Sequence, residues 1–479
     1  MKRTSDENYC DSSKKVICER FPSADVIPNS TKKIRIAVAG CSHGQMDKIY
    51  ATLAAVERKN RYKFDLLICC GDYQAVRNYG DLKHMHIKEK YRALNSFYRY
   101  YSAEVVIKFL PAFIELPLLY VLEAPVLTIF VGGNHEASGF LQELPNGGWV
   151  APKIYYMGHA SVLNFAGLRI AGLSGIYNKY HFDLGHYECP PFDNYGDLIS
   201  IYHVRSVDLF RLKQLRDPDG FCGKQLDMFV SHDWPAGIVD YGDKEKLLTL
   251  KPYFEEDINR NNLGNPASMS LLYDLRPRYW LAAHLHCKFA ALVSHQDKIN
   301  DGKNLEPTRF LSLDKPIRGR HFLQSLEFDV DINSEMALSY DPIWLAILRS
   351  TDKLTSICRT QVYMPSHHIK DERWDFRPTE EEIEDVKRIF KSNFKIPENF
   401  RRTAKPHVPG QDENCGAELY YRNPQSSEFC RKLGISDLNE MLCHLSVASL
   451  GLPHYLSESE ICSERSEKIL IDVETDSEF

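Results

Sequence analysis

The 479-residue chain lacks an excess of positive charge: its 59 lysines and arginines are outnumbered by 65 aspartates and glutamates, which leaves a formal net charge of −6. This balance excludes a protein that coats nucleic acid through bulk positive charge. The deficit is local, because residues 457–479 carry eight acidic and two basic side chains. The rest of the chain is therefore neutral overall, and a local basic groove is compatible with it.

The sequence also lacks cysteine pairs with CxxC spacing, an apolar segment near its N-terminus and internal repeats of solenoid period. Its thirteen cysteines, an odd number, favour buried thiols in a reducing compartment over a disulfide framework. The apolar residues 105–122 include Lys108, Glu115 and two prolines within the length of one bilayer span, so we expect no transmembrane helix.

The length exceeds that of one average domain, and a hydrophobic content of 43% is enough for a sizeable core, so we expect two or more folded units. Short apolar runs alternate with helical patterns, and polar residues cluster just after the runs. This is typical of an α/β layered sheet with its functional site at the strand ends. The strands are predicted at 34–39, 64–70, 125–131, 168–173, 226–231 and 279–283, and helices at 47–59 and 89–101.

The pattern divides the chain into four parts. Residues 1–32 are polar and mixed in charge, which predicts a flexible extension, and residues 33–295 carry the alternating pattern. Residues 296–403 are expected to form a smaller C-terminal α+β domain, with strand-like runs at 310–313, 323–330 and 344–348 and a charged helix over 380–394. Residues 404–479 are expected to be a weakly ordered tail with an acidic end.

Side chains that commonly bind metals follow the predicted strands within one to four residues. Because the strand ends meet at one edge of a sheet, we expect these side chains to converge. Imidazole nitrogens, a shared carboxylate, an amide oxygen and a thiolate suit Zn, Fe or Mn better than Mg or Ca. Two such metals a few ångströms apart would bind a phosphodiester. The residues are Cys41, His43, Asp72, Asn134, His135, His232, His284 and His286.

The order of these motifs resembles the metallophosphoesterase superfamily, whose pattern runs DxH, GDxxD, GNH(D/E), a lone H and GHxH. Five motifs in order are specific, whereas any one alone would be weak. The resemblance implies a layered β-sandwich flanked by helices, and it implies that His135 donates a proton or hydrogen bond to the phosphate or leaving oxygen. It further implies two metals bridged by Asp72, one held with Cys41, His43 and His286, the other with Asn134, His232 and His284.

Three departures narrow the resemblance: Cys41 replaces the first Asp of DxH, Ala75 the second Asp of GDxxD, and Ala283 the Gly of GHxH. The cysteine is what RNA lariat debranching enzymes carry. Stretches such as AVAGCSHGQMDKIY, GGNHEASGFLQELPNGGWVAPKIYY and YWLAAHLHCKFAAL are similar to that family too. The likeness covers about residues 33–403, with a break at 104–123.

Membership of this family implies hydrolysis of the 2′,5′-phosphodiester at the branch point of excised intron lariats by a metal-activated hydroxide, in intron turnover after splicing. It also implies one or two divalent metals (Fe, Zn or Mn) per site, branched RNA as the partner together with splicing-associated proteins, and no membrane. The protein is expected to be a monomer in the nucleus, with cytoplasmic shuttling.

Residues 174–205 form a long segment rich in Tyr, His and Pro, and loops of this length are usually functional or disordered. The segment matches the family's lariat recognition loop. Its aromatic side chains would stack on bases while Lys179 and Arg205 meet phosphates, and Arg77, Lys83, Lys88, Lys90, Arg92 and Arg99 would extend this basic track. The candidate RNA-binding residues are Tyr177, Asn178, Lys179, His181, His186, Tyr187 and Arg205.

Other interpretations of the same residues stay open. Cys41 alone is more often a small buried hydrophobe, Asn134 would also suit a helix N-cap, and His135 a passive hydrogen-bond partner. The loop 174–205 would also suit an Ω-loop packed on its own aromatics, and residues 104–123 a retained intron or mispredicted exon. At the level of function, the alternatives are a general metallophosphoesterase on linear nucleic acid or small phosphodiesters, and an inactive RNA-binding scaffold.

Overall fold

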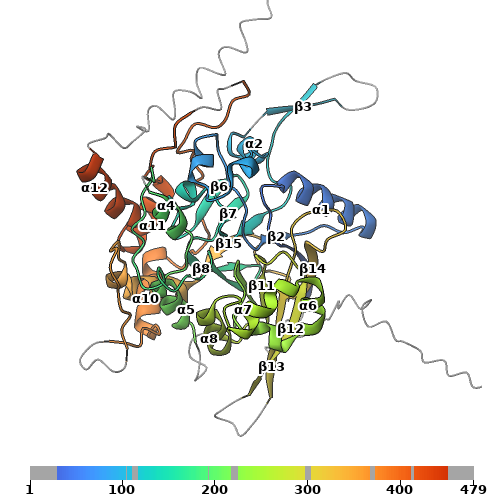
Figure 1. Ribbon diagram of the computed structural model, residues 1–479. Helices are drawn as coiled ribbons and strands as arrows, with labels where there is room; N and C mark the ends of the chain where they lie inside the picture. The colour runs from blue at the N-terminus through green and yellow to red at the C-terminus, as the bar shows by residue number, and fades with distance from the viewer. Residues whose placement is uncertain are drawn as a thin grey trace, which may run out of the picture.

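The fold is a sandwich of two mixed β-sheets with helices on both outer faces (Figure 1). The computed structural model describes residues 30–103, 105–109, 117–192, 194–216, 225–296, 304–366, 373–410 and 415–450. The expected flexible extension and the acidic end therefore fall almost wholly outside the described residues. Both sheets contribute to the central core, where Ile36 and Ile68 of one sheet pack with Ile170 and Val230 of the other.

The first sheet has the strand order β14-β1-β2-β5-β7-β6. Strands β1, β2, β5 and β7 run parallel, and β14 and β6 are antiparallel edges. The inner strands β2, β5 and β7 are short and wholly buried, as expected for parallel strands covered on both faces. The bounds are β1 Thr31–Ala39, β2 Leu66–Cys69, β5 Thr128–Phe130, β6 Gly148–Ala151, β7 Ile154–Tyr156 and β14 Leu323–Asp331.

The second sheet has the order β12-β13-β11-β10-β9-β8-β15, and its central strands β9, β10, β11 and β13 are parallel. The carboxyl ends of its parallel strands and those of the first sheet carry the loops that build the candidate site. The bounds are β8 Ala160–Phe165, β9 Leu168–Leu173, β10 Met228–Ser231, β11 Tyr279–Ala282, β12 Phe289–Gln296, β13 Asn304–Ser312 and β15 Leu338–Tyr340.

Helices cover the two sheets and begin where the sequence supplies caps. At α8, the side chain of Asn265 accepts hydrogen bonds from the backbone N–H of Ala267 and Ser268, and Pro266 takes the first helical position. The bounds are α1 Met46–Asn60, α2 Phe97–Tyr101, α3 Ser138–Leu141, α4 Tyr195–Ser200, α5 Ser206–Lys213, α6 Lys244–Leu250, α7 Glu255–Asn259, α8 Pro266–Leu275, α9 Pro342–Ser350, α10 Glu380–Phe390, α11 Pro424–Leu433 and α12 Leu438–Leu450.

The expected division at residue 295 does not separate the sheets. Strand β14 pairs along its whole length with β1, and β13 pairs with β11, so the segment beyond residue 296 completes both sheets. The expectation of a weakly ordered tail from residue 404 is wrong for the part that the structure describes. Helix α11 is anchored by Gln425, whose side chain bonds the backbone N–H and C=O of Trp149 at 2.8 and 2.9 Å.

Two predicted elements change type. The apolar run 344–348 lies in α9 and not in a strand, because Asp341 caps the segment and Pro342 begins the helix, and a short apolar run does not by itself distinguish the two. The predicted helix 89–101 is a 3₁₀ turn, Glu89–Tyr91, followed by the short α2.

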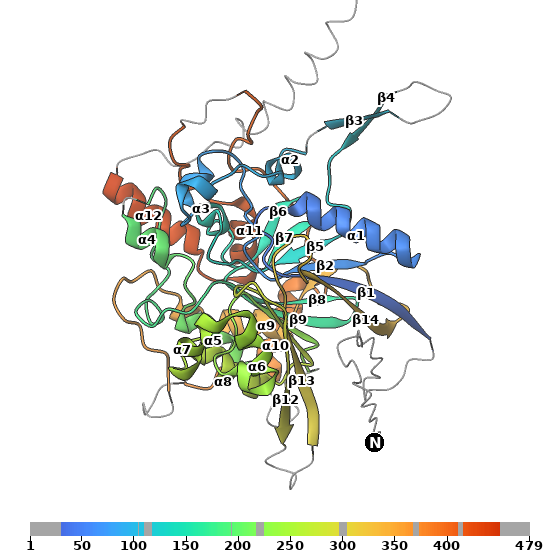
Figure 2. The ribbon, with the colours of Figure 1, turned by 45° about the vertical axis from the view of Figure 1, so that its right-hand side comes forward.

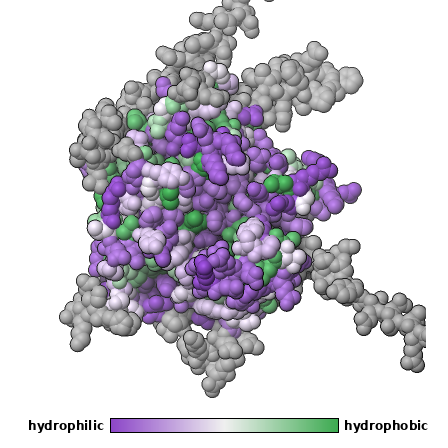
Figure 3. Space-filling model, in the orientation of Figure 1, coloured by the Kyte–Doolittle hydropathy of each residue, from purple (hydrophilic) through white to green (hydrophobic). Residues whose placement is uncertain are grey.

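The apolar stretch that interrupts the family resemblance contains an antiparallel hairpin of β3 Val105–Phe109 and β4 Pro117–Val121. It projects from the body at the upper right of Figure 2. Among the described residues, no helix has the length and apolar character needed to cross a bilayer. On the face shown in Figure 3, hydrophobic residues are scattered among hydrophilic ones.

Candidate metal centre

The two sheets bring the motif residues to one place. Cys41 and His43 follow β1, Asp72 follows β2, and Asn134 and His135 follow β5, all from the first sheet. From the second sheet, His232 follows β10, while His284 and His286 follow β11. The convergence expected from the sequence is therefore present in the structure.

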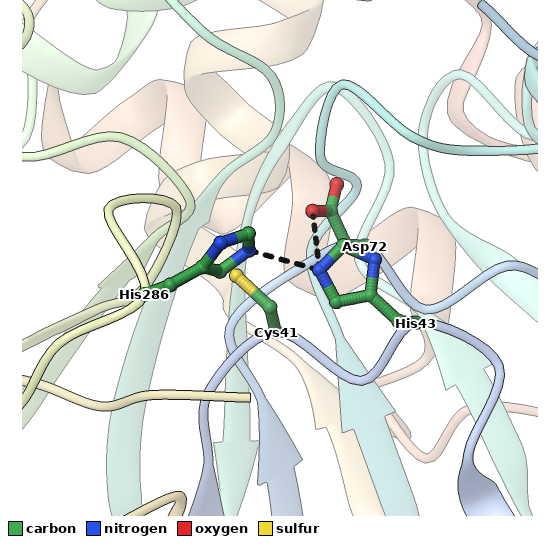
Figure 4. Close-up of side chains that lie close together, drawn as sticks. All are labelled: Cys41, His43, Asp72 and His286. Atoms are coloured by element: carbon green, nitrogen blue, oxygen red, sulfur yellow. Dashed lines mark hydrogen bonds and ion pairs between the residues drawn. The ribbon is translucent and has the colours of Figure 1, made fainter. Parts of the chain in front are cut away.

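Four of these side chains, Cys41, His43, Asp72 and His286, form a compact group (Figure 4). One ligand-type atom from each lies within 4.8 Å of the others. The Nε2 atoms of His43 and His286 are 2.9 Å apart, and His43 Nε2 lies 3.6 Å from Asp72 Oδ2. A thiol, two imidazoles and a carboxylate converging on one point fit a transition-metal dication.

The second expected group is built around the other oxygen of Asp72. His232 Nε2 lies 3.4 Å from Asp72 Oδ1 and 3.2 Å from Asn134 Oδ1. The ring of His284 is 5.0 Å from that of His232, and its backbone N–H donates to Cys41 Sγ at 3.1 Å. Asp72 thus faces one group with each oxygen, which fits the bridging position. Asn134 does not cap α3, whose N-cap is Ala137.

Charge states in the site suit metal binding. Burial lowers the pKa of His232 to about 4 and that of His286 to about 3, so both rings are neutral at pH 7, the form that ligates metals. Although burial alone would raise it, His232 and His135 hold the pKa of Asp72 well below its usual range. Burial and the charge of Asp72 raise the pKa of the Cys41 thiol, so a cation would be needed to make it a thiolate.

The backbone of the site is strained at four of the candidate metal ligands. His43, Asp72, His284 and His286 all have positive φ, between 45° and 60°, a region that non-glycine residues rarely occupy. Such strain is typical of functional sites, where the surrounding fold enforces it. Gly133 is needed for a different reason: a Cβ there would lie 2.3 Å from Asp72 Oδ1 and 2.8 Å from His232 Cε1.

His135 borders the group and is tied to Asp72 twice. Its backbone N–H donates to Asp72 Oδ1 at 2.9 Å, and its ring Nδ1 lies 3.2 Å from Asp72 Oδ2. Burial would lower the pKa of His135, but the hydrogen bond and charge of Asp72 outweigh it and raise that pKa. The carboxylate of Asp72 therefore shifts the imidazole of His135 toward its protonated form.

Sequence reasoning missed Glu136, the residue after His135. Its buried carboxylate accepts backbone hydrogen bonds from Tyr73 and Gln74, each at 2.7 Å, and from Gly133 at 3.0 Å. It therefore ties the loop after β2 to the loop after β5 and positions Asp72 relative to Asn134. The one local sign of this residue in the sequence is that it ends the motif GGNHE.

The loop 174–205 divides into an exposed part and a buried part. Lys179 and Tyr180 are exposed, Tyr177 and Asn178 are half-buried, and the ring Nδ1 of His181 lies 2.7 Å from that of His203. Tyr187, also half-buried, donates its hydroxyl to Ser200 Oγ at 3.1 Å. The Ω-loop interpretation thus describes the inner half of the loop, and the outer half offers aromatic and basic side chains to solvent.

Two candidate RNA-binding residues of this loop are not placed to contact RNA. Arg205 is fully buried and donates to the carboxylate of Glu188 and to backbone carbonyls of the loop. His186 is buried, with Nε2 2.9 Å from Asp208 Oδ2. In the expected basic track, Arg77 is likewise buried, between Asp81 at 2.8 Å and Glu143 at 2.7 Å. A basic side chain reads as exposed from sequence unless its partner is known.

Three aromatic residues next to the site were not among the named candidates, although Tyr195 and Tyr202 lie in the loop 174–205. His86 contacts the hydroxyls of Tyr202, at 2.7 Å, and Tyr195, at 2.6 Å, through its two ring nitrogens. The rings of His86 and Tyr202 are nearly parallel, with centroids 5.8 Å apart. Tyr202 lines the same cavity as Gly133, which places this cluster beside the site. Burial lowers the pKa of His86, and the charge of His135 lowers it further. No local motif marks these residues.

The fold and site define a metallophosphoesterase, as comparisons with known proteins show: residues 34–288 match the calcineurin-like phosphoesterase family. Residues 305–438 match the lariat debranching enzyme C-terminal domain. The chain is 53% identical to the lariat debranching enzyme of Caenorhabditis elegans, over 90% of this chain and 83% of that protein. It is 46% identical to the lariat debranching enzyme of Homo sapiens, over 85% of this chain and 70% of that protein.

The protein belongs to the lariat debranching enzyme family. It is accordingly a metal-dependent phosphodiesterase, and the fold class and family expected from the sequence are confirmed. The first family match ends at residue 288 and the second begins at residue 305. Strands from both sides of this gap nevertheless pair within the same two sheets.

Proposed function

We propose that this protein hydrolyses the 2′,5′-phosphodiester at the branch point of excised intron lariats and leaves linear RNA. The observation that carries the proposal is the compact group of Cys41, His43, Asp72 and His286, set at the strand ends beside an exposed aromatic loop. Family membership supports the reaction, since the relatives reported above are named for it. No residue of the site favours linear RNA or a silent scaffold.

The group of Cys41, His43, Asp72 and His286 would hold one divalent cation, and Asp72, Asn134, His232 and His284 a second. Such cations supply Lewis acidity toward phosphate oxygens and lower the pKa of water. The mixture of sulfur, nitrogen and oxygen donors supports Fe, Zn or Mn in place of Mg or Ca. Glu136 and the strained backbone hold these ligands in position before substrate arrives.

His135 supplies the proton-handling group of the chain. Its Nδ1 is engaged by Asp72, so Nε2 is the ring atom left to face a phosphate or leaving oxygen. The raised pKa of His135 favours a proton on that atom. A hydrogen bond from it would stabilise charge that develops as the P–O bond breaks.

The exposed aromatics support recognition of a branched nucleotide. Tyr180 is 73% exposed and Tyr195 67% exposed, and Lys179 stands beside Tyr180. Unstacked bases bind such side chains by stacking, which suits a branch point better than a regular helix. His86 and Tyr202 extend the aromatic surface toward His135.

The test compares His135→Ala with the matched variant His444→Ala, which changes an exposed histidine of α12. We expect His135→Ala to lower the rate of cleavage of a synthetic 2′,5′-branched RNA at least 100-fold, since general acid–base groups contribute about 10²–10⁴-fold. His444→Ala should match the unaltered protein. Full cleavage by metal-loaded His135→Ala would refute the role of His135.

We also propose that the protein acts as a monomer in the nucleus, with cytoplasmic shuttling and contacts to splicing-associated proteins. The support is the substrate, because excised introns arise where splicing occurs. Fluorescence of a tagged chain would test the compartment, and light scattering would test the mass. Exclusion from the nucleus would refute the proposed compartment, and a stable dimer would refute the proposed monomer.

A further inference from the structure

A second cluster of metal-binding side chains lies outside the candidate metal centre. It consists of His159, which precedes β8, His186 of the loop 174–205, and Asp208 of α5. One ligand-type atom from each lies within 4.8 Å of the others. His186 Nε2 is 2.9 Å from Asp208 Oδ2, and the rings of His159 and His186 are stacked with centroids 4.0 Å apart. Three separate segments thus meet at one point.

The cluster lines a cavity of about 40 Å³ that also borders Gly133 and Gln142. Gln142 is 3% exposed, its amide nitrogen donates to the Glu188 carbonyl, and its oxygen has no hydrogen-bond partner among the described residues. A buried acceptor without a partner is costly and usually marks a water or an ion. This unpartnered oxygen is an independent sign that the cavity receives a ligand.

A cation suits this place better than an anion. The carboxylate of Asp208 has no arginine or lysine within salt-bridge distance in the described structure; its contact is with the ring Nε2 of His186. Arg211 lines a second cavity together with His159, His186 and Asp208, and it directs its guanidinium to the hydroxyls of Thr351 and Thr355. A divalent ion would therefore be partly neutralised by Asp208 and would replace the contact between His186 and Asp208.

We propose that His159, His186 and Asp208 bind a transition-metal dication, of which zinc is the best match, at a site separate from the candidate metal centre. Two imidazoles and one carboxylate are a common zinc ligand set, and a water or the Gln142 oxygen would complete four-fold coordination. The ion would join the loop to β8 and α5. The metal site does not rest on the proposed function.

The test measures zinc bound per full-length chain after equilibration with zinc and gel filtration. Asp72→Asn with His43→Ala serves as the background, because it disables both groups of the metal centre. We expect this background to retain about one zinc per chain and to lose it when His159→Leu is added. A second variant, Asp208→Asn, should also lose it, and His181→Ala, a control in the same loop, should retain it.

The readout is metal content in variants shown to be folded by circular dichroism. Equal zinc content with and without His159→Leu would overturn the proposal, as would equal loss in His181→Ala. In the otherwise unaltered chain, His159→Leu should lower total zinc by about one equivalent and reduce the rise in melting temperature on zinc addition. Because no RNA is used, failure here is distinct from failure to cleave branched RNA.

Discussion

Replacing Gly133 with alanine tests whether the strand-end loops hold the metal ligands at fixed positions. The added Cβ would lie 2.3 Å from Asp72 Oδ1, where ordinary contact requires about 3.4 Å, so the carboxylate must move by roughly 1 Å. A misplacement of that size costs about 100-fold in rate, or about 2.7 kcal/mol of transition-state stabilisation. We therefore expect kcat/KM on branched RNA to fall about 100-fold, with loss of bound metal.

The adjacent glycine provides the control. A Cβ at Gly132 would meet its nearest neighbours, Leu141 and Ser174, at 3.5 Å, which is ordinary contact. Gly132→Ala should keep its activity and metal content. Both variants are assayed by gel electrophoresis of the RNA products and checked for folding by circular dichroism. Equal activity of folded Gly133→Ala and Gly132→Ala would refute the claim that Gly133 is required for the position of Asp72.

Three further predictions concern stability and binding. Arg205→Ala should lower the free energy of unfolding by about 3–5 kcal/mol, because it leaves Glu188 buried without its partner. Arg260→Ala, which removes an exposed ion pair with Glu256, should cost less than about 1 kcal/mol. Urea unfolding measures both, and equal costs would contradict the buried pair. Burial lowers the pKa of His84 to about 4, below the value of about 6.5 in the unfolded chain. Between these pH values the unfolded state binds one more proton than the folded state, so the free energy of unfolding falls as the pH drops from 6.5 to 4. His84→Leu should make the free energy of unfolding depend less on pH between 7 and 4, and an unchanged dependence would contradict this. Because Arg77 and Arg205 are buried in ion pairs, neither is available to contact phosphate, and the affinity for branched RNA should depend less on salt than the full basic track expected from the sequence would imply. A steep slope in binding titrations from 50 to 200 mM salt would contradict this.

The position of the metal centre could be predicted from sequence because it depends on local order. Each ligand follows a short apolar strand, and parallel strands place their carboxyl ends at one edge. Cys41, His43, Asp72 and His286 meet for that reason. Glu136 could not be given its role in the same way, since the backbone N–H groups that donate to its carboxylate belong to a loop 62–63 residues earlier in the chain.

The incorrect predictions share a physical cause: the residue or strand that pairs with each element is not its neighbour in the sequence. The sequence alone predicts that Arg77 lies on the surface, but in the structure it is buried against Glu143, 66 residues later. Arg205 is likewise predicted at the surface, but it is buried against Glu188 of the same loop. The pairing of β14 with β1 spans most of the chain and has no local signature, which is why the segment after residue 296 looked like an independent unit. Sequence patterns indicate elements, and packing decides their partners.

The central claim is that this metal centre hydrolyses the branch linkage. The direct measurement uses metal-loaded protein with two RNAs of the same sequence, one with a 2′,5′ branch and one linear, each with and without a chelator. We predict cleavage of the branched RNA at the 2′,5′ bond alone, lost with the chelator and restored by Fe, Mn or Zn. Equal cleavage of linear RNA, or cleavage of the branch in the presence of the chelator, would contradict the account.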